Sequence, residues 1–411
     1  MNALVHPAIR KASEENFTYI KGPRSGKDYR FYDSMYAVLD PDRRSPLSCI
    51  SVANNSLSVD LWTGCAFQCA YCHVQGIQED INPDDGKMRI RPIKRNEFTI
   101  DQILDALVIH PFFKKDKTII SIGTSSTEPF AIGEVLESTL EIMENLISRG
   151  YKNPFWIVTK AGIPEKAVDR LIKISKQVNK LILSMCYAGN NKKIEPAQNN
   201  RFKNIEKLQL DNSNISVNWY FRPFAREWFD DIENLELMFS NISKKYGQYI
   251  DSIVPGGLRW TEGIEYGVVE TRGLTLPSNI SKENNSKTLT GDDWVEFLNL
   301  SKKYFPDTPV YYHSSCALSL ALERSNISMI NLSKKDECEK SLCTFNQRNR
   351  CTIKDKLTKK AVQTELDAVG FGLEVLKFNP HDGELITNPS MHSLSPAIQT
   401  EVTHIISDLN D

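Results

Sequence analysis

The stretch Leu57-Ser-Val-Asp-Leu-Trp-Thr-Gly-Cys-Ala-Phe-Gln-Cys-Ala-Tyr-Cys-His73 decides the fold of this chain. It opens with an alternating apolar run that predicts a β-strand. It ends with Cys65, Cys69 and Cys72, spaced C-x3-C-x2-C. Three thiolates can hold three irons of a [4Fe–4S] cube and leave the fourth iron without a protein ligand, whereas structural zinc and ordinary electron-transfer clusters have a fourth protein ligand. The spacing therefore predicts that another molecule binds the open iron. The alternative is three unrelated cysteines, or a zinc site completed by a distant ligand.

The composition is that of a globular protein. The chain has 411 residues, of which 40% are hydrophobic and 25% charged. Lys and Arg number 50 against 52 Asp and Glu, so a net charge of −2 gives no overall attraction to nucleic acid or to an anionic membrane. The sequence shows no signal peptide and no apolar run of membrane-spanning length. Nine cysteines with metal-like spacing then predict metal ligation in the reducing cytoplasm rather than disulfides.

Strand-like and helix-like segments alternate along the chain. The expected strands are 57–62, 118–123, 154–159, 180–185, 215–221 and 250–254, and the clearest helices are 132–148 and 164–178. This alternation predicts an α/β fold with a parallel sheet, either open or closed into a full or partial barrel. We expect four regions: an N-terminal extension with few clear elements (1–55), the core (56–277), a cysteine-rich region (278–358) and a small α/β tail (359–411).

Polar side chains follow three of the expected strands, where parallel α/β folds bind their ligands. The run Gly123-Thr-Ser-Ser-Thr-Glu-Pro-Phe130 offers hydroxyl groups and the carboxylate of Glu128, suited to the amino-acid part or the ribose of S-adenosylmethionine (SAM). Lys160 follows the next strand and can pair with a carboxylate. Ser184 and then Arg201 follow the strand after that. Taken singly, such residues are more often solvated turns or helix caps.

These residues resemble those of the spore photoproduct lyase-like branch of radical SAM proteins, over about residues 55–260. The matching positions are Ser58–Cys65, Thr124-Ser125, Glu128–Phe130, Thr159-Lys160, Ser184, Glu195-Pro196 and Arg201. The resemblance implies a partial (β/α)6 TIM-like barrel with an oxygen-sensitive [4Fe–4S] cluster on the three cysteines. It implies reductive cleavage of SAM to methionine and a 5′-deoxyadenosyl radical that abstracts hydrogen from an organic substrate. By position, Ser125, Lys160 and Ser184 look like SAM contacts, and the loop around Tyr71 packs near the adenine.

One position departs from this family. True spore photoproduct lyases carry a hydrogen-donating cysteine where this chain has Gly123, directly before Thr124-Ser125. A glycine cannot return a hydrogen atom to a thymine radical, which counts against DNA repair. Cys186, after another strand, is a candidate hydrogen donor, and its alternative role is that of a small buried residue filling the barrel interior.

A second group of cysteines lies downstream. Cys316, Cys338, Cys343 and Cys351 fall within 36 residues, with 21, 4 and 7 residues between them. Four thiols in this arrangement resemble the auxiliary-cluster extensions of several radical SAM branches and predict one metal centre. A second [4Fe–4S] cluster, a single iron and a structural zinc all remain open, and His313 could replace one thiol. The alternative is packing, because the segment 316–322 is apolar and helix-like.

Three functions follow from these observations. The first is a radical SAM enzyme acting on a small metabolite or peptide, with a one-electron reductant such as flavodoxin or ferredoxin as its partner. The second keeps this chemistry and acts on nucleic acid, which would require a basic surface near the barrel mouth. The basic cluster to inspect for this role lies in the N-terminal extension and consists of Lys21, Arg24, Lys27, Arg30, Arg43 and Arg44. The third is a non-catalytic iron–sulfur protein.

Overall fold

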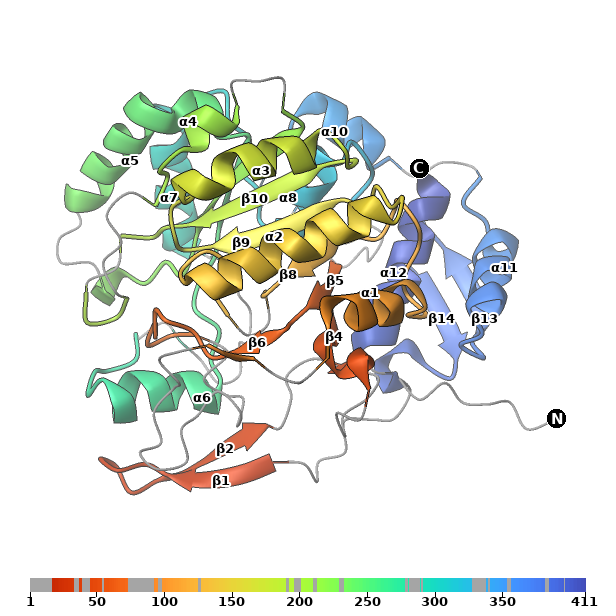
Figure 1. The fold of residues 1–411 in the computed structure, drawn as a ribbon, viewed down its shortest axis with the longest axis horizontal. Helices are drawn as coiled ribbons and strands as arrows, with labels where there is room; N and C mark the ends of the chain where they lie inside the picture. The colour runs from red at the N-terminus through yellow and green to blue at the C-terminus, as the bar shows by residue number, and fades with distance from the viewer. Residues whose placement is uncertain are drawn as a thin grey trace.

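A computed structural model gives the fold of the chain (Figure 1). The residues outside its description are 1–16, 33–36, 39–44, 54, 73–91, 95–97, 125–126, 190–191, 196–200, 210–212, 229–232, 278–279, 281–288, 290, 327–337, 339–340, 353–355, 381–383 and 395. Among the described residues, no helix is both long enough and apolar enough to cross a membrane.

An eight-stranded sheet forms the centre of the fold. Its parallel part consists, in spatial order, of β5 (Ser56–Val59), β8 (Ile120–Ile122), β9 (Phe155–Thr159), β10 (Leu181–Cys186), β11 (Ile215–Phe221) and β12 (Ser252–Pro255). Two antiparallel strands continue the sheet beyond β5: β4 (Ile50–Ala53) and β3 (Ala37–Val38). The predicted α/β class with a parallel sheet is therefore confirmed. Closure into a partial barrel stays a prediction.

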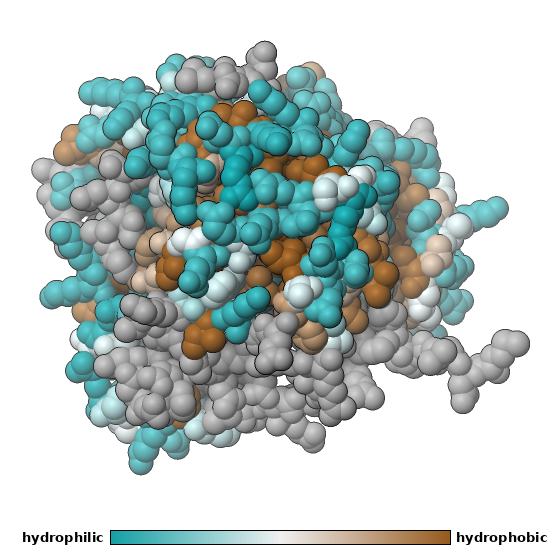
Figure 2. Space-filling view, in the orientation of Figure 1, coloured by the Kyte–Doolittle hydropathy of each residue, from teal (hydrophilic) through white to brown (hydrophobic). Residues whose placement is uncertain are grey.

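Helices cover one face of this sheet. They are α1 (Ile100–Val108), α2 (Gly133–Ser148), α3 (Glu165–Ser175), α4 (Ile205–Leu208), α5 (Glu233–Tyr246) and α7 (Gly291–Tyr304). Alternate strand residues such as Phe155 and Ile157 pack under them in the main core, because successive side chains of a strand point to opposite faces. The exposed side of these helices is rich in polar side chains, as Figure 2 shows for the face toward the viewer.

A second apolar cluster lies on the opposite face of the sheet. Trp156, Ile182 and Val254 come from the strands and pack with Ala317 and Leu318 of α8 (Ser314–Ala321). Later parts of the chain extend the sheet beyond β12. Val310 forms a parallel bridge with Ile253 of β12, and Leu342 forms an antiparallel bridge with Val310. The segment from Val310 to Ala321 therefore covers this second, inner face of the sheet.

The N-terminal region has more structure than the sequence indicates. Besides β3 and β4, it forms a hairpin of β1 (Phe17–Lys21) and β2 (Asp28–Tyr32) that lies beside α6 (Glu262–Glu265) (Figure 1). Glu270 fixes this hairpin: its carboxylate accepts from the backbone N–H of Arg24 at 2.7 Å and from the Tyr29 hydroxyl at 3.0 Å. Long-range contacts of this kind leave no periodic signal in a sequence.

The C-terminal tail consists of a helix, two strands and a second helix. These elements are α11 (Lys359–Val369), β13 (Glu374–Asn379), β14 (Glu384–Asn388) and α12 (Pro396–Asn410). The two strands pair with each other, and α12 packs on α11. Short elements complete the described chain: β6 (Trp62–Thr63), β7 (Ile93–Lys94) and α10 (Phe345–Arg350).

Candidate functional site

The cysteine loop follows the first parallel strand. The predicted strand 57–62 is split, because β5 ends at Val59 and β6 pairs separately with β7. The turn into the loop is made at Gly64, whose φ of +81° favours glycine. The loop is then tied to the segment after β10 by a backbone bond of 2.8 Å from the Ala70 N–H to the Ile194 carbonyl. The three thiols therefore lie at the carboxyl end of the sheet, as predicted.

The three thiols lie within electrostatic reach of one another. Burial raises the pKa of Cys65 to about 12, and the negative charges of Cys72 and Glu128 raise it further. Burial likewise raises the pKa of Cys69, with Lys160 opposing the shift and Cys72 and Cys65 adding to it. Buried thiols this close together can all be deprotonated at the same time only if a metal centre supplies positive charge.

A buried ionic group adjoins the cysteine loop. The Lys160 ammonium lies 2.6 Å from the Tyr71 hydroxyl and 3.7 Å from the Glu195 carboxylate. Tyr71 donates to Glu195, and Arg201 forms an ion pair with the same carboxylate. The guanidinium of Arg201 also donates to the Cys186 carbonyl at 2.9 Å. Three strand-end loops thus meet at one carboxylate.

Charge is unbalanced in this group. Burial acts to lower the pKa of Lys160, but Glu195 and Cys69 raise it above its ordinary value. Burial acts to raise the pKa of Glu195, but Lys160 and Arg201 lower it below its ordinary value. All three groups are therefore ionised near neutral pH, and two cations face one carboxylate. The net charge of +1 suits an anionic ligand, such as a carboxylate or a cluster bound to three thiolates.

Glu128 joins two of the loops. Its carboxylate accepts from the Phe130 N–H at 3.3 Å, from the Lys160 N–H at 2.8 Å and from the Thr159 hydroxyl. Burial raises the pKa of Glu128, and these donors oppose the shift. A carboxylate has about four acceptor positions, so one is left for a ligand. Glu128 thus holds the loops after β8 and β9 together, a role the sequence did not indicate.

The loop after β8 presents hydroxyl groups that lack partners. The side-chain oxygens of Thr124 and Thr127 are buried and form no hydrogen bond with the described residues. Unsatisfied buried hydroxyls are uncommon, and a bound polar ligand would satisfy them. They fit the predicted contact with the amino-acid part of SAM. Ser125, the SAM contact expected in this loop, lies outside the described residues.

Ser184 and Cys186 lie on β10 with side chains on the inner face. The Ser184 hydroxyl accepts from the Trp156 indole at 2.9 Å, so this indole is its observed partner. Cys186 is buried in the inner apolar cluster, and burial raises the pKa of its thiol to about 11 although the nearby Lys160 opposes the shift. The thiol therefore keeps its hydrogen at neutral pH, at the end of the strand nearest the ionic group.

Two residues of the site were missed by sequence reasoning alone. Trp228 stacks on Tyr71, with ring centroids 5.8 Å apart and planes at 24°. Glu195 is the centre of the ionic group, although the sequence suggested it only as part of the family resemblance. Arg201 was the available signal, because a buried arginine requires an anionic partner.

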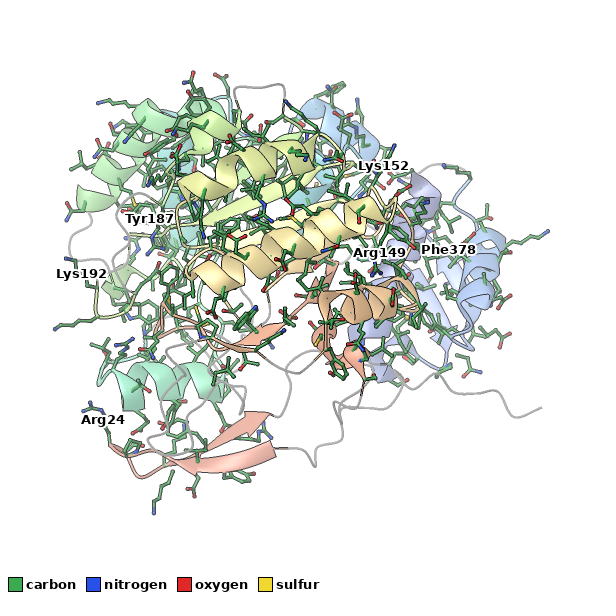
Figure 3. The ribbon with its side chains drawn as sticks, viewed as in Figure 1. Arg24, Arg149, Lys152, Tyr187, Lys192 and Phe378 are labelled. Atoms are coloured by element: carbon green, nitrogen blue, oxygen red, sulfur yellow. The ribbon has the colours of Figure 1, made fainter. Side chains whose placement is uncertain are left out.

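Two of the four described basic residues of the N-terminal cluster, Lys27 and Arg30, lie beside carboxylates. Lys27 pairs with Glu265 at 2.7 Å. Arg24 donates to the Glu270 carbonyl at 2.8 Å. Figure 3 shows Arg24 at the end of the β1–β2 hairpin, beside α6. The Arg30 guanidinium lies 3.9 Å from Glu262. Arg43 and Arg44 lie outside the described residues.

Cys316, Cys338, Cys343 and Cys351 form a separate group, away from the cysteine loop. Cys316 lies on α8, and Cys351 ends α10. His313 directly precedes α8, where its ring lies 6.1 Å from that of Tyr312. Among the residues that the structure describes, no three His, Cys, Asp or Glu side chains converge closely enough to hold one metal ion.

Comparison with known proteins gives a limited resemblance. No protein-family profile matches the chain, and no curated protein is similar to it. Two solved structures, both mutants of spore photoproduct lyase, are similar in fold. One has a TM-score of 0.43 and 14% identity, covering 62% of this chain and 76% of its own. The other has a TM-score of 0.45 and 15% identity, covering 65% and 79%. At this level of similarity the chemistry has to be argued from the residues of the site itself.

Proposed function

We propose that this protein is a radical SAM enzyme. The observation that carries the proposal is the loop with Cys65, Cys69 and Cys72 at the carboxyl end of the first parallel strand, beside a buried group of net charge +1. Three thiolates on a cluster core of charge +2 give a cofactor of net charge −1, which this group complements. The missing fourth thiolate leaves one iron for SAM.

Each part of the site has a proposed task. When bound, the cluster and SAM would supply an electron and a 5′-deoxyadenosyl radical that abstracts hydrogen from an organic substrate. Lys160 and Arg201 favour the anionic cofactor and the SAM carboxylate. Thr124 and Thr127, with Ser125 and Ser184 as further proposed contacts, offer hydroxyls to the SAM amino-acid group. Glu128 fixes the two loops that carry these residues.

The substrate we propose is a small molecule or a peptide. DNA repair of the spore photoproduct type is disfavoured, because Gly123 has no thiol that could donate a hydrogen atom. The backbone is also built for glycine here: φ is +68°, and a Cβ would lie 3.2 Å from the Thr127 carbonyl oxygen. A cysteine at this position would therefore be strained. The carboxylates of Glu265 and Glu262 beside Lys27 and Arg30 also reduce the described basic surface that nucleic acid would need. Cys186 is the proposed hydrogen donor if the substrate radical has to be quenched.

The test is reductive SAM cleavage. Protein reconstituted with iron and sulfide without oxygen, then given dithionite and SAM, should release 5′-deoxyadenosine. Cys72→Ala should abolish this product, and the matched control Cys49→Ala should not, because Cys49 is a buried core residue outside the cysteine loop. If the wild type binds a cluster yet forms no 5′-deoxyadenosine, the protein is a non-catalytic iron–sulfur protein and the proposal fails.

SAM binding can be measured separately from its cleavage. Lys160→Met should weaken SAM binding to the reconstituted, unreduced protein by about tenfold or more, because it removes a buried charge. Lys166→Met is the control, since Lys166 is an exposed residue on α3. Equal affinities for both variants would contradict the role proposed for Lys160. The physiological reductant is expected to be a flavodoxin or a ferredoxin.

A further inference from the structure

The four C-terminal cysteines come together from separate segments of the chain. Cys316 lies on α8, Cys343 lies two residues before α10, and Cys351 follows α10. Cys316 and Cys343 both pack against the inner apolar cluster, and the Cys338 carbonyl accepts from the Ser341 N–H at 3.2 Å, two residues before Cys343. The segments that carry the four cysteines therefore meet in one region.

Donor groups surround these sulfurs. The Asn326 side-chain amide lies 2.6 Å from the Cys316 sulfur, and the Asn326 backbone N–H donates to the Cys351 sulfur at 3.3 Å. The Gln347 side-chain amide approaches the Cys351 sulfur at 3.5 Å, and the Cys343 sulfur lies 3.9 Å from the Tyr311 hydroxyl. Such donors stabilise negative charge on sulfur and are a known influence on the potential of iron–sulfur clusters.

Among the described residues, these cysteines are not grouped as the ligands of a single ion would be. One Zn²⁺ with Zn–S bonds of about 2.3 Å would hold its sulfurs about 3.8 Å apart in a tetrahedron. No three metal-binding side chains of the described residues converge in that way. A cluster places its thiolates further apart, because its core is several atoms wide and each thiolate binds a different iron. The same holds for Cys65, Cys69 and Cys72: their thiols lie near one another, yet they are not grouped as the ligands of a single ion would be.

Two neighbours of the second group contact other parts of the fold. Arg324, two residues before Asn326, donates to the carbonyl of Lys117, three residues before β8. Asn410 at the end of α12 donates to the carbonyl of Thr352, the neighbour of Cys351. Figure 3 shows the two ends of the sheet: Tyr187 follows β10 on one side, and Lys152 precedes β9 on the other.

We propose that Cys316, Cys338, Cys343 and Cys351 bind a second iron–sulfur cluster, of the [4Fe–4S] type, in which the protein supplies a ligand to every iron. This centre does not depend on the proposed SAM chemistry. With all four irons ligated it has no open position for substrate. It joins α8, α10 and the segment around Asn326, and so holds in place the chain that covers the inner face.

The first experiment removes the cysteine loop as a ligand. The variant Cys65→Ala/Cys69→Ala/Cys72→Ala, reconstituted without oxygen, should keep about four irons and a matching amount of sulfide per chain. Adding Cys316→Ser and Cys351→Ser to this triple variant should remove the iron and sulfide. Adding Cys49→Ala to the triple variant, as the matched control, should leave both in place. Zinc in place of iron, or no metal, in the triple variant would overturn the proposal.

A second experiment covers the case in which the ligand variants fail to fold. Asn326→Leu keeps every cysteine but removes the side-chain donor to Cys316. In the triple-variant background it should keep the iron and shift the reduction midpoint to a more negative potential, because an N–H···S bond stabilises the reduced cluster. An unchanged midpoint would contradict the placement of a cluster between Cys316 and Cys351. Neither experiment measures 5′-deoxyadenosine, so each can fail while the proposed function stands.

Discussion

Removing either partner of the buried Glu195–Arg201 ion pair should strongly destabilise the protein. The two side chains are only 3% and 5% exposed. Breaking a buried pair by deleting one partner costs about 3–5 kcal/mol, because the remaining charge is left uncompensated. Arg201→Met leaves Glu195 with Lys160 at 3.7 Å and with Tyr71, so we expect the lower end, about 3 kcal/mol. Glu195→Gln leaves two buried cations facing each other, and we expect about 5 kcal/mol.

Urea unfolding of the apoprotein measures these losses, and a double-mutant cycle separates the pair from its surroundings. The double variant should be less destabilised than the sum of the single variants, with a coupling of about 2 kcal/mol. Lys207→Met is the control, since Lys207 forms an exposed pair with Glu165 and such pairs contribute about 0–1 kcal/mol. Losses below 1 kcal/mol for both single variants, or strict additivity, would refute the reasoning.

The pH dependence of the same variants gives an independent check. Because the pKa of Glu195 is lowered in the folded state, its contribution is fully present above its ordinary pKa of 4.5 and is lost as the pH falls through the folded value. Wild-type stability should therefore decrease below about pH 4.5 more steeply than that of Glu195→Gln. Parallel stability curves for the two proteins would contradict the ionised state assigned to this carboxylate.

Three further predictions concern other parts of the chain. Burial raises the pKa of Glu401 to about 7, although Lys114 opposes the shift. The contribution of Glu401 to the free energy of unfolding should therefore decrease as the pH rises from about 4.5 to 7. Glu401→Gln should remove this pH dependence from the free energy of unfolding measured across that range. Gly123→Ala should cost about 1–3 kcal/mol in thermal or urea unfolding, more than Gly150→Ala, where φ is also positive but no atom lies within 4 Å of the added Cβ. Cys186→Ala should leave 5′-deoxyadenosine formation intact while changing the products from substrate, and loss of SAM cleavage itself would contradict a donor role.

The sequence predicted the regular part of the fold well. The strand 215–221 matches β11 residue for residue, and the helix 132–148 differs from α2 by a single residue at its start. These elements are buried on both faces or strongly amphipathic, so local pattern and tertiary packing agree. The expected strand 57–62 was wrong in one respect. The buried Asp60 accepts from the Ser51 hydroxyl at 2.8 Å, and β5 ends before it.

The site was predictable where it depended on spacing in the chain. The spacing of Cys65, Cys69 and Cys72 was enough to predict a loop after the first parallel strand, and the open metal position on it stays a prediction. The buried ionic group could not be predicted from spacing, because only the fold brings Lys160, Glu195 and Arg201 together. Nothing in the sequence marks Asn326 as a neighbour of the cysteines. Its side-chain amide contacts Cys316, 10 residues away, and its backbone N–H contacts Cys351, 25 residues away.

The helix α8 has a consequence for how the chain can be divided. A shortened chain ending near residue 277 would keep every parallel strand but would expose Trp156, Ile182 and Val254, which α8 and its neighbours bury. Such an apolar surface favours aggregation. Residues 1–277 therefore should not be obtainable alone as a stable fragment, and recombination with another protein of similar fold should succeed only when the strands and α8 are exchanged together. Natural deletions in this protein are accordingly expected in its loops rather than between residues 310 and 322.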